Sequence, residues 1–176
     1  MKNLCNANDR NPGESGLRSF FYVLLLGIFL AVAGVVWYGN QLIISVIPED
    51  NLQMFRFPTK VGDEWHYLYI HSVQQTPCEE FFTIKGSNDM LMTYTRFQSY
   101  GVGLPCYTDD GKFKQTDDGH FILEMNRPYK NVAFRTQDIP KPRLYINGEE
   151  IPIYKLYPSG TLVTVTVDKR YKMWLD

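Results

Sequence analysis

Four polar residues in one short stretch have side chains suited to binding or proton transfer: His71, Ser72, Glu80 and Arg96. A histidine beside a serine suggests the base and nucleophile of a hydrolase. Adjacent residues of a β-strand point to opposite faces, however, so His71 cannot deprotonate Ser72. A carboxylate facing Arg96 across two antiparallel strands would form an ion pair. Two interpretations follow: either His71, Glu80 and Arg96 form one polar site for a partner or ligand, or the ion pair is structural.

These residues must be positioned by three strands. Residues 65–73 alternate with a period of two, and both faces are mostly apolar or aromatic, which predicts a strand covered on both sides. Turn residues at 74–77 and 86–89 separate it from strands at 79–85 and 91–97. The sequence does not decide which residues of the strands at 79–85 and 91–97 lie opposite each other. If Lys85 faces Leu91, Glu80 lies opposite Arg96, and a shift of one residue puts Glu79 there.

The rest of the chain also favours short strands. Asn147-Gly148 between apolar runs predicts a hairpin over 143–153 with a type I′ turn, and Pro152 makes its second arm an edge. Residues 120–125 read as a strand, 126–128 as a break and 161–167 as a strand. The predicted fold class is therefore an all-β extracytoplasmic domain, a sandwich or small barrel of about 8–10 antiparallel strands.

An uncharged apolar run at residues 20–38 precedes these strands. As a helix it would rise about 29 Å, close to the ~30 Å hydrocarbon core of a membrane. Twelve of its residues are Phe, Val, Leu or Ile, which favours insertion by roughly 4–7 kcal/mol in sum. Trp37 and Tyr38 stand at its far end, where interfacial aromatic residues belong. The sequence predicts one N-terminal transmembrane helix.

Positive charge sets the expected orientation. Lys2, Arg10 and Arg18 precede the apolar run, and the next cation is Arg56. Because cationic loops stay in the cytoplasm, the N-terminus should be cytoplasmic and the bulk of the protein periplasmic or extracellular. A signal peptide cleaved after Ala33, at an A-x-A site, is the alternative. The apolar run continues past Ala33, which favours an uncleaved anchor in the inner (cytoplasmic) membrane.

The expected organisation is thus a cytoplasmic tail at 1–18, a transmembrane anchor at 19–40 and an extracytoplasmic β-domain at 41–176. Cys78 and Cys106 would both lie outside the cytoplasm, where they either form a disulfide or remain free, partly buried thiols.

Composition and motifs exclude several classes of function. A formal net charge of −1 provides no basic field for nucleic acid. Thr-Asp-Asp-Gly occurs at 108–111 and 116–119, but the spacing fits no EF-hand and favours turns over calcium. His66 and His71 point to opposite faces of a strand, so no zinc site is expected. The chain has neither a nucleophile elbow nor a phosphate loop. We expect no metal, no cofactor and no enzymatic activity.

Five segments, in order, resemble a bacterial family catalogued as domain of unknown function 1850. They are HSVQQTPCEEFF, TRFQSYGVGLP, HFILEMNRP, RLYINGEEIPI and SGTLVTVTV, and the likeness covers roughly Phe55 to Val167. The family often has Glu directly after His-Ser-Val, whereas this chain has Gln74. The positions that match the family's pattern are His71, Ser72, Val73, Glu80, Arg96, Gly101, Gly103, Pro105 and Arg127.

This resemblance implies a role beside a transporter. Family members look like small membrane-anchored or exported proteins encoded beside fused permeases of TRAP transporters of the TAXI class. The expected function is therefore a non-catalytic accessory protein that contacts the membrane, such a permease and its solute-binding protein. The alternative is a module that binds a small solute, with Arg96 or Arg127 pairing a carboxylate. An extracytoplasmic enzyme is the weakest of the three readings.

Overall fold

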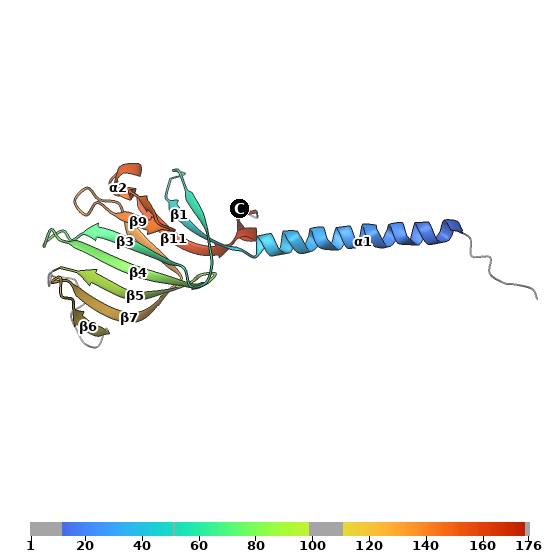
Figure 1. Ribbon diagram of the computed structural model, residues 1–176. Coiled ribbons are helices and arrows are strands. Elements are labelled where there is room, and N and C mark those ends of the chain that lie inside the picture. The colour runs from blue at the N-terminus through green and yellow to red at the C-terminus, as the bar shows by residue number, and fades with distance from the viewer. Residues whose placement is uncertain (1–11, 51, 99–110, 175–176) are drawn as a thin grey trace, which may run out of the picture. The chain divides into compact units, whose positions relative to one another are not determined.

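The computed structural model describes residues 12–50, 52–98 and 111–174 (Figure 1). The chain divides into two compact units between Gly39 and Asn40. The predicted boundary between anchor and β-domain, at residues 40 and 41, lies one residue from this division.

The first unit contains helix α1, Pro12–Gly39. It begins earlier than the predicted start at residue 19, because proline is well tolerated in the first turn of a helix. Within it, the 23 residues Leu17–Gly39 are long and apolar enough to cross a membrane. The sequence therefore correctly predicts one N-terminal apolar helix of membrane-spanning length.

The second unit, the β-domain, consists of two antiparallel sheets (Figure 1). The small sheet has the order β2-β1-β11-β8 and the large sheet the order β10-β9-β3-β4-β5-β7-β6. The small sheet comprises β1 Leu42–Pro48, β2 Phe55–Thr59, β8 Asn131–Arg135 and β11 Leu162–Lys169. The large sheet comprises β3 Glu64–Ile70, β4 Pro77–Gly86, β5 Asp89–Phe97, β6 Lys112–Gln115, β7 Phe121–Tyr129, β9 Arg143–Ile146 and β10 Glu149–Ile151. Two short helices, α2 Ile153–Leu156 and η2 Arg170–Trp174, complete the described part of the domain.

The core lies between the inner faces of the two sheets. Trp65 on β3 and Phe82 on β4 are each 1% exposed and stack with ring centroids 4.4 Å apart. Val165 on β11 is fully buried against the same cluster. Tyr67 of the large sheet stacks on Phe134 of the small sheet at 4.5 Å. Large apolar residues alternate along the strands, so that one face of each sheet packs into the same hydrophobic core.

Several predicted elements are confirmed. β9 and β10 form the expected hairpin, and Asn147 and Gly148 both have positive φ, as a type I′ turn requires. The all-β class is correct. The break predicted at 126–128 is wrong, because β7 continues to Tyr129 and absorbs an irregularity in its pairing with β5. The predicted strand 65–73 ends at Ile70, and its outer residues His66 and Leu68 are only half-buried rather than covered.

Candidate functional site

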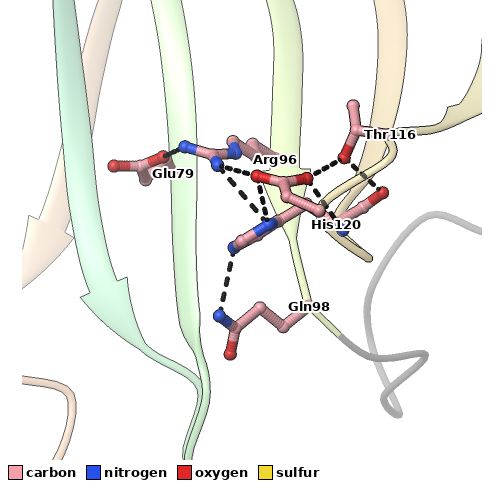
Figure 2. A network of polar contacts seen from close by, with 6 residues as sticks. Glu79, Arg96, Gln98, Thr116 and His120 are labelled. Carbon is pink, nitrogen blue, oxygen red and sulfur yellow. Dashed lines mark hydrogen bonds and ion pairs between the residues drawn. The ribbon is translucent and has the colours of Figure 1, made fainter.

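The large sheet carries a polar network on its outer face, centred on Arg96 of β5 (Figure 2). Arg96 lies opposite Glu79 of β4, and its Nη1 is 3.5 Å from Glu79 Oε2. Its Nη2 donates to Asp118 Oδ2 at 3.0 Å. Of the two registers left open by the sequence, the structure has the one that pairs Arg96 with Glu79. Glu80 therefore points to the opposite face of the sheet.

The turn between β6 and β7 supplies the second half of this network. His120 Nδ1 lies 2.9 Å from Asp118 Oδ2, and His120 Nε2 lies 3.1 Å from the amide nitrogen of Gln98 (Figure 2). The Thr116 hydroxyl also contacts Asp118 Oδ1. The hydrogen bond from Thr116, followed by those from His120, holds the pKa of Asp118 below its usual range. Asp118 therefore stays ionised and helps to fix the Arg96 guanidinium.

This arrangement is a poor receptor for a free carboxylate. Arg96 already contacts two carboxylates, those of Glu79 and Asp118. An anionic ligand would have to displace the Asp118 carboxylate from the Arg96 guanidinium and break that ion pair. The geometry at Arg96 thus favours a preformed polar surface over an anion-binding pocket.

A row of stacked rings crosses the outer face beside the network. Tyr145 of β9 stacks on His66 of β3 at 4.4 Å, His66 on Phe81 of β4 at 4.8 Å, and Phe81 on Tyr94 of β5 at 4.1 Å. All four are half-buried. Burial lowers the pKa of His66, partly opposed by the charge of Glu79, so the imidazole is neutral at pH 7. These four residues, here called the aromatic row, form a continuous ring surface across four neighbouring strands.

A second cluster lies on the inner face around Glu80. The Tyr69 hydroxyl donates to Glu80 Oε1 at 3.4 Å. Thr95 pairs with Glu80 across β4 and β5 and is 1% exposed. Its buried hydroxyl has no hydrogen-bond partner among the described residues. Burial is the main cause that raises the pKa of Glu80, whereas Tyr69 and the charge of Arg127 act in the opposite direction. An acid held among aromatic rings and desolvated in this way resists ionisation.

Glu80 also perturbs its neighbours. Burial, followed by the Glu80 charge, raises the pKa of the Cys78 thiol to about 11. The same two causes raise the pKa of Tyr67 and Tyr69 above the usual tyrosine range. The Cys78 thiol is therefore protonated at neutral pH and a weak nucleophile. Cys78 is buried and forms no disulfide within the described residues. Cys106 lies outside the described residues, so the bridge between them stays a prediction.

The predicted site residues that the structure describes do not lie together in one site. His71 lies in the turn after β3, where its Nδ1 accepts from the backbone N–H of Val73 at 3.3 Å and of Gln74 at 3.2 Å. The Ser72 carbonyl accepts from Gln75 Nε2 at 2.6 Å. Both therefore shape the β3–β4 turn. Arg127 is exposed on β7. Gly101, Gly103 and Pro105 lie outside the described residues.

Sequence reasoning missed the residues that complete the outer network. Asp118 falls in the second Thr-Asp-Asp-Gly stretch, for which the sequence favours a turn over calcium, and His120 begins the predicted strand at 120–125. The usable signal was the spacing, since an aspartate and a histidine two residues apart in a tight turn can face each other. Across residues 12–50, 52–98 and 111–174, no three His, Cys, Asp or Glu side chains converge to hold a metal.

Substitution of Glu80 by glutamine should stabilise the β-domain at neutral pH. The pKa of Glu80 is higher in the folded protein than in the unfolded chain. The β-domain therefore loses stability as the pH rises from the pKa of the unfolded state through that of the folded state. The neutral amide of glutamine does not have to be ionised in the buried site. We therefore expect the free energy of unfolding to rise by about 0.5–2 kcal/mol at pH 7. The gain should vanish near pH 4, where the carboxyl is protonated in both states.

Urea unfolding at pH 4 and pH 7 measures this difference. The matched control is Glu79→Gln, which removes a carboxylate from the outer face and loses the contact with Arg96. It should be neutral or destabilising at pH 7. Equal gains for Glu80→Gln at both pH values would show that burial of charge is not the cause.

The fold and its surfaces define a β-sandwich domain that follows a helix of membrane-spanning length and displays an aromatic row beside a charged network. Residues 66–153, half of the chain, match the family described as domain of unknown function (DUF1850). The chain belongs to this family. No curated protein and no solved structure matches it.

Proposed function

We propose that this protein is a non-catalytic, membrane-anchored accessory subunit that docks on a TRAP-type transporter of the TAXI class. The candidate span anchors it in the inner membrane, with the N-terminus cytoplasmic and the β-domain periplasmic or extracellular. The aromatic row supplies the contact surface. The fused permease and its solute-binding protein are the proposed partners, because the resemblance described in the sequence analysis implies a role beside such permeases.

The aromatic row is the observation that carries this proposal. Tyrosine, phenylalanine and arginine are enriched at protein interfaces, and rigid aromatic anchors supply most of the binding energy. Here the stacking of the rings fixes their positions before binding, which lowers the entropic cost of association. The neighbouring Arg96 is held by Glu79 and Asp118, so it presents an ordered polar rim.

Substitution of two rings should release the partner. We expect the double variant Phe81→Thr/Tyr94→Thr to weaken binding by at least tenfold, because interface aromatic residues often contribute 1–2 kcal/mol or more each. Threonine preserves strand propensity. Co-purification from detergent, with the permease and solute-binding protein co-expressed and the permease tagged, measures the loss.

The matched control is Ile47→Thr on the outer face of the small sheet, where Ile47 is 37% exposed. It removes a comparable apolar side chain and should leave co-purification unchanged. A double variant that co-purifies as well as wild type would rule out the aromatic row as the docking surface. A fully active transporter isolated without this protein would rule out the accessory role.

A further inference from the structure

The C-terminal end of the β-domain carries cations and exposed aromatic side chains together. Residues 169–174 read Lys-Arg-Tyr-Lys-Met-Trp, and helix η2 begins at Arg170. Tyr171 is 39% exposed and Trp174 is 54% exposed. Aromatic and basic side chains in one segment are typical of protein surfaces that lie at the boundary between membrane and water.

Strand pairing ties this segment to the point where the chain leaves α1. Lys169 is the register partner of Leu42, and the Arg170 backbone N–H donates to the Gln41 carbonyl at 2.9 Å. Lys169 Nζ also donates to Asn40 Oδ1 at 3.0 Å. Gln41 follows Gly39, the last residue of α1, by two positions, a path of at most about 7.6 Å between Cα atoms. Covalent connectivity alone therefore keeps residues 169 and 170 next to the end of the apolar helix.

A groove of about 530 Å³ opens beside the same strand end. It is a size typical of small-molecule sites. Its wall includes Lys60 and the apolar side chain of Val61, which is 61% exposed. The full lining is Asn40, Gln41, Leu42, Pro58, Thr59, Lys60, Val61 and Asp63.

The described residues of this segment and groove carry a net positive charge, although the whole chain carries a net negative one. Among the described residues of this segment and groove, the cations are Lys60, Lys169, Arg170 and Lys172 and the acids are Asp63 and Asp168, whereas the whole chain has a formal net charge of −1. Lys172 Nζ pairs with Asp168 Oδ1 at 2.5 Å, and Asp63 Oδ2 accepts from the Thr59 hydroxyl and the Lys60 backbone N–H. Both acids are thus engaged locally, and the surplus of charge is cationic.

We propose that residues 169–174 and the groove beside them form a membrane-docking surface that binds anionic phospholipid headgroups. The inference depends on the proposed anchoring of the β-domain by α1. Each lysine or arginine near an anionic bilayer strengthens binding about fivefold. Tyr171 and Trp174 enter the interfacial layer, and the groove accepts the headgroup phosphate beside Lys60. The docked surface restrains the β-domain at the bilayer.

Trp174 provides a direct probe in the full-length protein. The chain has tryptophans at 37, 65 and 174. Trp37→Phe removes the one in α1, and Trp65, 1% exposed, serves as a buried reference. The protein is reconstituted in phosphatidylcholine vesicles with a minor fraction of brominated phosphatidylglycerol or, separately, brominated phosphatidylcholine. Bromine quenches only tryptophans that lie within the bilayer or its interface.

We expect brominated phosphatidylglycerol to quench Trp174 at least twofold more than the same fraction of brominated phosphatidylcholine. High salt, or Lys169→Gln with Lys172→Gln, should abolish this preference. The control pair Lys141→Gln/Lys155→Gln removes two exposed lysines and should preserve it. Trp174→Phe confirms which signal is quenched.

Carbonate extraction in parallel separates this inference from the anchoring. Trp174 unquenched by either lipid, in protein that resists extraction, would overturn the docking surface and leave the anchor in place. Equal quenching by both lipids would overturn the recognition of anionic headgroups, as would a preference that survives the lysine variants. Release by carbonate would overturn both proposals.

Discussion

Replacement of Trp65 by alanine is expected to lower the free energy of unfolding of the β-domain by about 3–5 kcal/mol. Trp65 is 1% exposed, and its ring lies parallel to that of Phe82, 4.4 Å away with an interplanar angle of 10°. Alanine would leave a cavity between the two sheets that the rigid strands cannot close. Because domains of this size are stable by only about 5–15 kcal/mol, the loss removes much of the total.

The surroundings of the Trp65 indole nitrogen make this estimate specific to packing. The indole Nε1 is buried and has no hydrogen-bond partner among the described residues, so the substitution breaks no hydrogen bond within that part of the chain. Trp65→Phe retains a ring that can stack on Phe82 and should cost less. Urea unfolding followed by circular dichroism measures both variants.

Trp174→Ala is the matched control, since Trp174 is 54% exposed. Its effect on the free energy of unfolding should stay within about 0.5 kcal/mol, as for most surface substitutions. A Trp65→Ala variant within 1 kcal/mol of wild type would show that the shared interior of the two sheets is not organised around this ring.

Local patterns in the sequence were sufficient to predict the strand content. The Asn147-Gly148 turn was recognisable because a type I′ turn needs positive φ at both central positions, and few residue pairs allow it. Period-two alternation in residues 65–70 likewise placed Trp65, Tyr67 and Tyr69 on one face. These features depend on residues close together in the chain.

The pairing of distant strands could not be predicted in the same way. β1 pairs with β11, which brings Leu42 opposite Lys169, and no local signal encodes such a contact. The register of β4 against β5 was equally open, and it decides whether Glu79 or Glu80 meets Arg96. A slip of one residue reverses every side chain. The predicted single site of His71, Glu80 and Arg96 therefore separated into an outer network, an inner cluster and a turn.

Two arginines in α1 are expected to abolish membrane integration. Leu26→Arg and Leu30→Arg lie one turn apart within Leu17–Gly39. Each replaces a residue that favours insertion by one that opposes it, a change of about 3–4 kcal/mol, or about 6–8 kcal/mol for the pair. This is comparable to the roughly 4–7 kcal/mol that the apolar residues of the span contribute in sum. The variant protein should move from the carbonate-resistant membrane fraction to the soluble fraction.

The control Leu26→Ala/Leu30→Ala keeps the helix and its neutrality, so the protein should stay in the membrane. Mass spectrometry of the wild-type protein distinguishes an anchor from a signal peptide, because cleavage after Ala33 would remove the mass of residues 1–33. An intact chain that the arginine pair releases and the alanine pair does not would support α1 as the anchor. A mature chain that begins at Gly34, or an arginine variant that still resists carbonate, would contradict it, because in both cases the apolar character of α1 would not be what holds the β-domain at the membrane.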